Sequence, residues 1–240
     1  MIYHHLKKGT FSQRLNRFVA EVYLNGQKER VHVKNTGRLR ELLLQGAEVI
    51  LEESHQPNRK TKYSLIAVKK DGRWVNIDSQ APNAVAYEAI REGRIAELKQ
   101  IQLLKKEVKY HDSRFDFYFE TKSEKGFIEV KGVTLEKNGI ALFPDAPTSR
   151  GTKHIWELVK AGKEGYKGIL LFIIQMEGCR CFAPNRYTDP DFADALVQAS
   201  RHGVEILAYE TKVSSCGMDI GRKIPVELTN QRHGNQKSDH

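Results

Sequence analysis

Apolar and polar residues alternate along the first eighty positions, a period of two that is typical of β-strands. The stretch RFVAEVYLNGQKERVHVK alternates on both sides of Asn25-Gly26, a pair that favours the tight turn of a β-hairpin. Further short strands are predicted over 47–54, 61–70 and 74–78. With a single short helix predicted over 37–46, five strands favour a small barrel of the oligonucleotide/oligosaccharide-binding (OB) type.

From residue 81 onward the pattern changes to helices alternating with strands. Helices are predicted over 83–92, 148–162 and 188–203. Strands are predicted over 103–110, 114–120, 126–136, 168–176 and 204–210. Thr148 and Asp189 are suited to cap the N-termini of the second and third helices, and Gly162 and Gly203 to end them. This order of elements predicts a mixed sheet with helices on both faces, an α/β domain.

The switch of period divides the chain into parts. We expect a barrel domain over 1–80, an α/β domain over 81–228 and a flexible polar tail over 229–240. The longest apolar run, GILLFIIQM, is far shorter than the ~20 residues that span a bilayer, and the start of the chain has no secretory signal. Three cysteines do not make a disulfide framework, so we expect reduced thiols in a cytoplasmic protein without a membrane span.

Charge points to the class of partner. The 240 residues include 39 lysines and arginines against 30 acids, a net charge of +9. This excess favours an anionic partner, nucleic acid first and an acidic membrane surface second.

One strand carries charges where core residues are expected. Along FIEVKG (127–132), alternation places Glu129 and Lys131 on one face. The upstream strand SRFDF carries one acid, Asp116, and if the two strands pair, Asp116 and Glu129 lie close together. The opposite face of that upstream strand is predicted to carry the three aromatic residues Phe115, Phe117 and Phe119.

Two neighbouring buried carboxylates repel each other, which raises the pKa of one or requires a counter-charge. A divalent cation supplies that charge, and a few oxygen ligands completed by water suit Mg²⁺, with Mn²⁺ as the alternative. Lys131 is placed to steady an attacking water or the charge that grows on a phosphate. Asp116, Glu129 and Lys131 are therefore the candidate catalytic residues, with the two acids as metal ligands.

The pattern Asp116…Glu129-Val130-Lys131 resembles the signature of the PD-(D/E)XK nuclease superfamily, which includes an acid on a preceding helix. The acids that this resemblance offers for that further catalytic and metal-binding position are Glu88 first, and then Glu107 and Glu92.

Other blocks, in one order from about residue 11 to 228, resemble the sugar fermentation stimulation protein A (SfsA) family. They are RLNRFVAEV, NTGRLRELLLQG, SRFDF, EVKGVTLE, ALFPDAPTSRGTKHIWEL and FAPNRYTDPDFADAL. The resemblance implies an OB-like N-terminal domain joined to a PD-(D/E)XK-like, restriction-endonuclease-like C-terminal domain. It also implies DNA binding with little sequence preference, connected to the regulation of sugar (maltose) utilisation.

Basic residues on the barrel and around the helix at 148–162 are candidates for contacts with the DNA backbone. They are Arg14, Arg17, Arg38, Arg40, Arg114, Arg150 and Lys153. His154 is open to two interpretations, a proton shuttle or a packing residue. Asp145, in a turn, is expected to be structural, and Trp156 is expected in the core.

Two other functions stay open at this point. The chain can be a binding-only regulator or accessory protein whose carboxylates are structural. It can also be an oligosaccharide-binding protein, although the charge of +9 and the lack of aromatic clusters on the barrel argue against sugar stacking.

Overall fold

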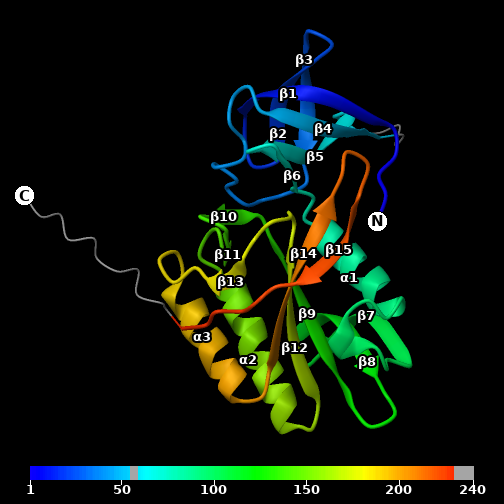
Figure 1. Cartoon of the computed structure of the whole chain (residues 1–240), viewed down its shortest axis with the longest axis vertical. Coiled ribbons are helices and arrows are strands. Elements are labelled where there is room, and N and C mark those ends of the chain that lie inside the picture. The colour runs from blue at the N-terminus through cyan, green and yellow to red at the C-terminus, as the bar shows by residue number, and fades with distance from the viewer. Residues whose placement is uncertain (55–58, 230–240) are drawn as a thin grey trace, which may run out of the picture.

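Five strands close a barrel in the N-terminal part of the chain (Figure 1). The structure, a computed structural model, describes residues 1–54 and 59–229. The barrel strands are β1 (Leu6–Arg14), β2 (Val19–Leu24), β3 (Gln27–Val33), β4 (Glu48–Glu53) and β5 (Tyr63–Lys70). Antiparallel neighbours follow the order β3-β2-β1-β4-β5, and a parallel pairing of β3 with β5 closes the ring. The predicted OB-type barrel is confirmed.

The predicted hairpin at Asn25-Gly26 joins β2 to β3. Both residues have positive φ, +50° and +80°, as a two-residue hairpin turn of type I′ requires. The helix predicted over 37–46 is wrong, because this segment is a series of turns in which Leu39 has a φ of +50°, outside the α-helical region. Leu39 and Leu42 are buried in the core, which explains their helix-like spacing.

The fifth barrel strand differs from the predicted one. The strand predicted over 74–78 is β6 (Arg73–Asn76), which pairs with β5 outside the closed ring. The ring is completed by β1, in which Phe11 is the one fully buried residue. Since most of β1 is polar or partly exposed, its sequence lacks the alternation that marks the other strands.

The C-terminal part is a mixed sheet, as predicted, but it has six strands in the order β15-β14-β12-β9-β8-β7, and β15 was not among the five predicted. Its strands are β7 (Leu103–Tyr110), β8 (Ser113–Glu120), β9 (Lys125–Val133), β12 (Lys167–Ile174), β14 (Glu205–Val213) and β15 (Met218–Lys223). The three central strands β9, β12 and β14 are parallel, and the outer strands are antiparallel to their neighbours.

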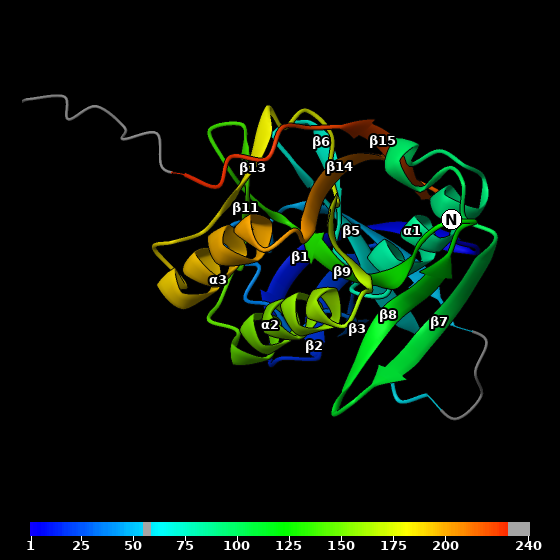
Figure 2. The same cartoon turned by 90° about the horizontal axis from the view of Figure 1, so that it is seen from below.

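Helices cover both faces of this sheet (Figures 1 and 2). Helix α1 (Ala81–Arg91) and the short 3-10 helix η1 (Ala96–Leu98) pack on one face, and α2 (Ser149–Lys163) and α3 (Pro190–Arg201) on the other. Thr148 caps α2 by accepting from the Gly151 N–H, and Asp189 caps α3 by accepting from the Phe192 N–H.

Two details of α2 differ from the prediction. The helix passes Gly162 and ends at Lys163, and Gly165 takes the positive φ, +86°, that follows its end. Trp156 was expected in the core but is 45% exposed on the outer face of α2. No helix among residues 1–54 and 59–229 has the length and apolar character needed to cross a membrane. The tail predicted over 229–240 lies outside the described residues apart from Thr229.

A small sheet that the sequence did not predict lies next to the barrel (Figure 1). It consists of β10 (Leu135–Lys137), β11 (Ile140–Phe143) and β13 (Cys181–Pro184). Nearby, the fully buried Gln175 donates to the backbone carbonyls of Asn76 and Asp78 and so joins the barrel domain to the end of β12. The end of β12 thereby has a fixed position beside the barrel.

Candidate functional site

Asp116 lies where β8 and β9 stop pairing. The ladder between them runs from Glu120–Lys125 to Phe117–Ile128. One residue further, the carboxylate of Asp116 accepts from the backbone N–H of Val130 (2.7 Å) and from the amide of Asn83 on α1 (2.7 Å). The Asp116 carboxylate thus takes the place of a backbone carbonyl as the acceptor for the Val130 N–H. Through Asn83 it also links β8 and β9 to α1.

Because β8 stops pairing with β9 at Asp116, its side chains do not occupy the faces of the sheet that alternation predicts. Phe115, Phe117 and Phe119 were predicted to share one face, and this is wrong. Phe117 and Phe119 pack on the α1 side, whereas Phe115 packs against Phe127 on the α2 side, with ring centroids 5.0 Å apart. The alternation breaks because β8 leaves the regular ladder at Asp116.

Glu129 on β9 is 3% exposed and faces α2. Its Oε1 accepts from the Lys131 ammonium (2.6 Å) and lies 2.6 Å from Nδ1 of His154. Its Oε2 is also buried and has no hydrogen-bond partner among the described residues. Burial alone would raise the pKa of Glu129, but the His154 hydrogen bond and the Lys131 charge outweigh it and hold this pKa below its usual value.

The pKa of Asp116 shifts the opposite way. Burial and the charge of Glu129 raise it, and the hydrogen bonds from Val130 and Asn83 only partly offset them. A divalent cation would relieve the repulsion and use the unpartnered Oε2 of Glu129. Two carboxylates fit a hard cation that keeps several water ligands, so the residues present suit Mg²⁺.

The predicted further acids are engaged in other ion pairs. Glu88 accepts a salt bridge from the α-amino group of Met1 (2.6 Å). Glu107 pairs with Arg114 and Glu92 with Arg94, both at exposed positions. The part of the chain that the structure describes contains no group of three His, Cys, Asp or Glu side chains placed to hold a metal ion. The structure therefore brings Asp116 and Glu129 together without a third acid.

Two polar residues join the site instead. His154 was left open by the sequence, and it is buried against Glu129 because α2 packs on that face of the sheet. Asn83 was missed, since one asparagine near a helix start carries no signal for a contact 33 positions away.

A basic hollow of about 380 Å³ adjoins this site. His154 forms part of its wall and links the hollow to Glu129. The hollow is lined by Lys109, Asp112, Ser113, Arg114, Arg150, Lys153 and His154. Three of the predicted nucleic-acid-binding residues, Arg114, Arg150 and Lys153, thus meet around one opening. Four cations and one acid line the opening; Arg114 and Lys153 also pair with Glu107 and Glu157 outside the lining, and the remaining positive charge makes the opening attractive to a phosphate.

The four arginines predicted on the barrel are not equivalent. Arg17, Arg38 and Arg40 are exposed, whereas Arg14 donates all five of its N–H groups to backbone carbonyls. Those carbonyls belong to Asn16, Arg17, Asn35, Gly37 and Arg38. Since no donor is left over, Arg14 has a structural role in place of the predicted phosphate contact.

Asp145 connects this barrel loop to the segment before α2. Its Oδ2 accepts from the backbone N–H of Arg38 (3.1 Å), in keeping with the expected structural role. A Cβ at Gly37 would lie 2.6 Å from the same oxygen, so the contact requires a glycine there.

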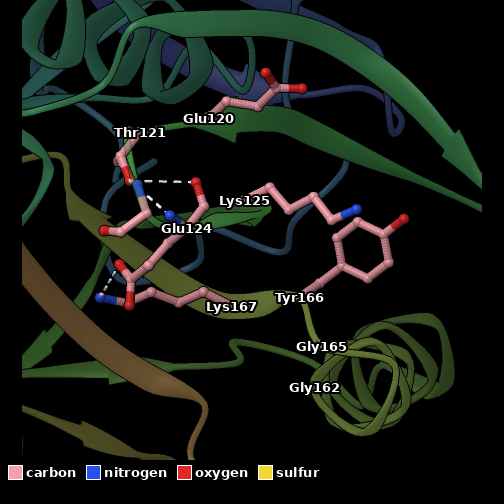
Figure 3. A pocket seen from close by; sticks show the side chains of 9 residues that line it. Glu120, Thr121, Glu124, Lys125, Gly162, Gly165, Tyr166 and Lys167 are labelled. Atoms are coloured by element: carbon pink, nitrogen blue, oxygen red, sulfur yellow. Dashed lines mark hydrogen bonds and ion pairs between the residues drawn. The ribbon is translucent and has the colours of Figure 1, made fainter.

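Figure 3 shows a second hollow, of about 670 Å³, between the turn that joins β8 to β9 and the C-terminal end of α2. The lysines of this hollow already have partners within it. Lys167 pairs with Glu124 (3.6 Å), and the Lys125 ammonium lies 4.8 Å from the ring centre of Tyr166. This hollow lies at the opposite end of α2 from His154, so it is separate from the carboxylate site.

Fold and site together define a two-domain protein, an OB barrel joined to a mixed α/β domain in which the buried carboxylate of Glu129 lies close to the half-buried carboxylate of Asp116. Family models describe the same two parts, "SfsA N-terminal OB domain" over residues 13–77 and "Sugar fermentation stimulation protein RE domain" over residues 80–217. The chain belongs to the sugar fermentation stimulation protein (SfsA) family.

Individual relatives extend over nearly the whole chain. The sugar fermentation stimulation protein homolog of Alkaliphilus oremlandii is 52% identical, covering 95% of this chain and 99% of the relative. The homolog of Desulfitobacterium hafniense strain Y51 is 48% identical with the same coverage. A solved structure of Pyrococcus furiosus SfsA in complex with Ca²⁺ superposes with a TM-score of 0.87 at 29% identity, covering 95% of this chain and 98% of that one.

Proposed function

We propose that this protein binds DNA with little sequence preference and hydrolyses phosphodiester bonds with a divalent metal ion. The observation that carries the proposal is the neighbouring pair of carboxylates, the half-buried Asp116 and the buried Glu129, with Oε2 of Glu129 unpartnered among the described residues. Buried like charges without a bound cation are costly, and such pairs are frequent at functional sites.

Asp116 and Glu129 would hold the metal, with Mg²⁺ expected and Mn²⁺ as the alternative. The Ca²⁺ in the Pyrococcus furiosus relative supports a divalent ion. A bound cation supplies a water of lowered pKa and stabilises charge on the phosphate. Lys131 balances the charge of Glu129 and orients the attacking water. A contribution from Glu88 requires its release from Met1.

The DNA backbone would lie across the basic hollow and continue over the exposed arginines of the barrel. The bond between Asp145 and Arg38 keeps these two basic regions adjacent. Contacts to phosphates carry no sequence information, which accounts for the proposed lack of preference.

Removing cations from the hollow should weaken binding uniformly across sequences. For Arg150→Ala and Lys153→Ala, we expect the slope of log affinity against log salt to fall by about 1 for each lost phosphate contact. Fluorescence anisotropy with a labelled duplex in EDTA measures this slope. Arg201→Ala, an exposed arginine at the end of α3, is the matched control. If the wild type and the three variants all give the same slope, DNA does not contact the hollow.

His154 is expected to fix the orientation of the Glu129 carboxylate. His154→Ala should weaken metal binding by about 10- to 100-fold, the usual cost of losing a group that orients a ligand. His154→Asn keeps a donor near the position of Nδ1 and should recover part of the affinity. Calorimetric titration with Mn²⁺ measures both variants. If both bind Mn²⁺ as the wild type does, His154 only packs.

A binding-only function is the second candidate. It is favoured by the absence of a third acid near Asp116 among the described residues, and by the two side chains, Lys131 and His154, that already contact Glu129. In that case the protein would act as a DNA-binding regulator or accessory protein. Under either proposal, the protein influences sugar (maltose) utilisation through its binding to DNA. The proposed location is the cytoplasm, a reducing compartment in which the three free cysteines stay reduced.

One cleavage assay separates the two candidates. Labelled single- and double-stranded DNA and RNA are incubated with the protein in Mg²⁺, Mn²⁺ or EDTA. The hydrolase predicts cleavage that needs metal and is lost in Asp116→Ala and Lys131→Ala. Strong binding without cleavage in any metal supports the binding-only protein. The absence of binding at low salt contradicts both.

A further inference from the structure

The turn between β1 and β2, residues 15–18, exposes two apolar side chains. Leu15 is 40% exposed and Phe18 is 49% exposed, although both adjoin strands that contribute to the barrel core. An exposed aromatic ring on a turn does not stabilise the fold by burial, so it is a candidate for contact with a partner.

This turn is held rigidly by hydrogen bonds. The side chain of Asn16 accepts from the backbone N–H groups of Phe18 (2.9 Å) and Val19 (3.0 Å). The carbonyl of Phe18 accepts from the N–H of Val33 on β3 (2.8 Å). The Arg14 guanidinium donates to two further carbonyls of the turn, those of Asn16 and Arg17. Phe18 therefore projects from a fixed backbone, which lowers the entropy lost on binding.

The surroundings of Phe18 are cationic. Arg14 also binds carbonyls of residues 35–38, which draws that segment against the turn. Arg17, Arg38 and Arg40 are exposed there, and none of the three has an ion-pair partner among the described residues. An exposed apolar ring on a turn that has exposed arginines in and next to it complements a ligand that has both a flat apolar face and negative charge.

We propose that Phe18 stacks on an unpaired base of a nucleic-acid strand while Arg17, Arg38 and Arg40 contact its phosphates. Aromatic rings beside a positively charged track are how single strands are held without sequence preference, and loops of OB-type barrels bind oligonucleotides. A second copy of the chain fits less well, because a two-fold contact through this patch would bring the arginines of both copies together. The inference rests on the proposed nucleic-acid binding and adds a single-stranded region as the ligand.

The test compares two probes of equal length and charge, labelled oligothymidylate and the same strand with abasic positions, by fluorescence anisotropy in EDTA. The wild type should prefer oligothymidylate. Phe18→Ala should weaken binding to that probe by about 5- to 150-fold, the range for loss of one stacked base, and leave binding to the abasic probe unchanged. Phe18→Trp keeps a stacking ring and should restore the preference. Tyr187→Ala, which removes an aromatic residue that is 98% exposed outside this turn, should have no effect.

Circular dichroism and the melting temperature establish that each variant is folded. If the wild type binds both probes equally, or if Phe18→Ala keeps the preference, the stacking inference fails while nucleic-acid binding stands. If the wild type binds neither probe nor duplex DNA at low salt, the proposed function fails with it. A change of sedimentation coefficient in Phe18→Ala without a change in binding would assign the patch to a second copy.

Discussion

Asp116→Asn is expected to lower metal-dependent DNA cleavage by at least about 100-fold, because even the loss of a group that only orients a metal ligand costs about 10- to 100-fold. In the metal-free protein the same substitution should not lower stability at pH 7. The introduced amide can accept from the Val130 N–H and donate to a flipped Asn83, so both hydrogen bonds of the site persist in changed form.

The effect on stability should depend on pH. Burial and the charge of Glu129 raise the pKa of Asp116 in the folded protein above its value in the unfolded chain. The folded state then binds this proton more tightly, so the stabilisation from the proton is complete at low pH and is lost as pH rises through the folded pKa. Asp116→Asn avoids the unfavourable charge at this half-buried position, so its gain in stability over the wild type should be largest near pH 7 and shrink as pH falls.

Thermal unfolding in EDTA between pH 4 and 7 measures this difference in stability between the variant and the wild type. For a chain of this size, each kcal/mol shifts the melting temperature by about 2–4 °C. Asp112→Asn, the same change at an exposed position of the basic hollow, is the control. Full cleavage activity in Asp116→Asn, or a melting temperature well below the wild type at pH 7, would contradict the account of the site.

Arg14→Ala should destabilise the protein by about 2–4 kcal/mol, because it removes five charged donors from backbone carbonyls. With about 2–4 °C per kcal/mol, this loss lowers the melting temperature by roughly 5–15 °C. Arg14→Lys should recover little, since an ammonium has three donors and lacks the planar fork of the guanidinium.

Arg17→Ala provides the matched comparison. Its side chain is exposed, so its removal should change stability by less than about 0.5 kcal/mol while it weakens DNA binding. Urea unfolding and binding assays on the two variants therefore separate the structural arginine from the binding one. Equal stability of Arg14→Ala and Arg17→Ala would contradict the role assigned to Arg14.

The elements that the sequence predicted correctly have strong local signals. Asn25-Gly26 fits the positive φ values of a two-residue turn, and Thr148 and Asp189 cap the helices that follow them. The placement of Glu129 and Lys131 on one face follows from alternation within one strand. In each case the interaction joins residues at most three positions apart, so the pattern contains all that is needed.

The features that were missed or wrong depend on distant contacts. Strand β1 is held by pairing with β2 and β4 on both sides in spite of its polar sequence. The turns at 37–46 are stabilised by burial of Leu39 and Leu42 in a core built from other segments. At Asp116 the alternation changes because a side chain bonds to the neighbouring strand, which no pattern within β8 indicates.

The site shows the same limit. Glu88 was assigned to the metal site from a superfamily pattern. In the structure its carboxylate instead pairs with the amino group of Met1, a contact between residues 87 positions apart. Arg14 and Arg17 are indistinguishable in the sequence, and their roles differ because only Arg14 points toward the carbonyls of two loops.

The proposed hydrolysis requires that Asp116 and Glu129 together form a divalent-metal site. Calorimetric titration of the purified protein with Mn²⁺ at pH 7, alongside Asp116→Asn and Glu129→Gln, tests it directly. We predict one ion bound with both carboxylates present and the loss of that binding in each variant. Heat of binding that is the same in all three proteins, or no binding by the wild type, would contradict the account.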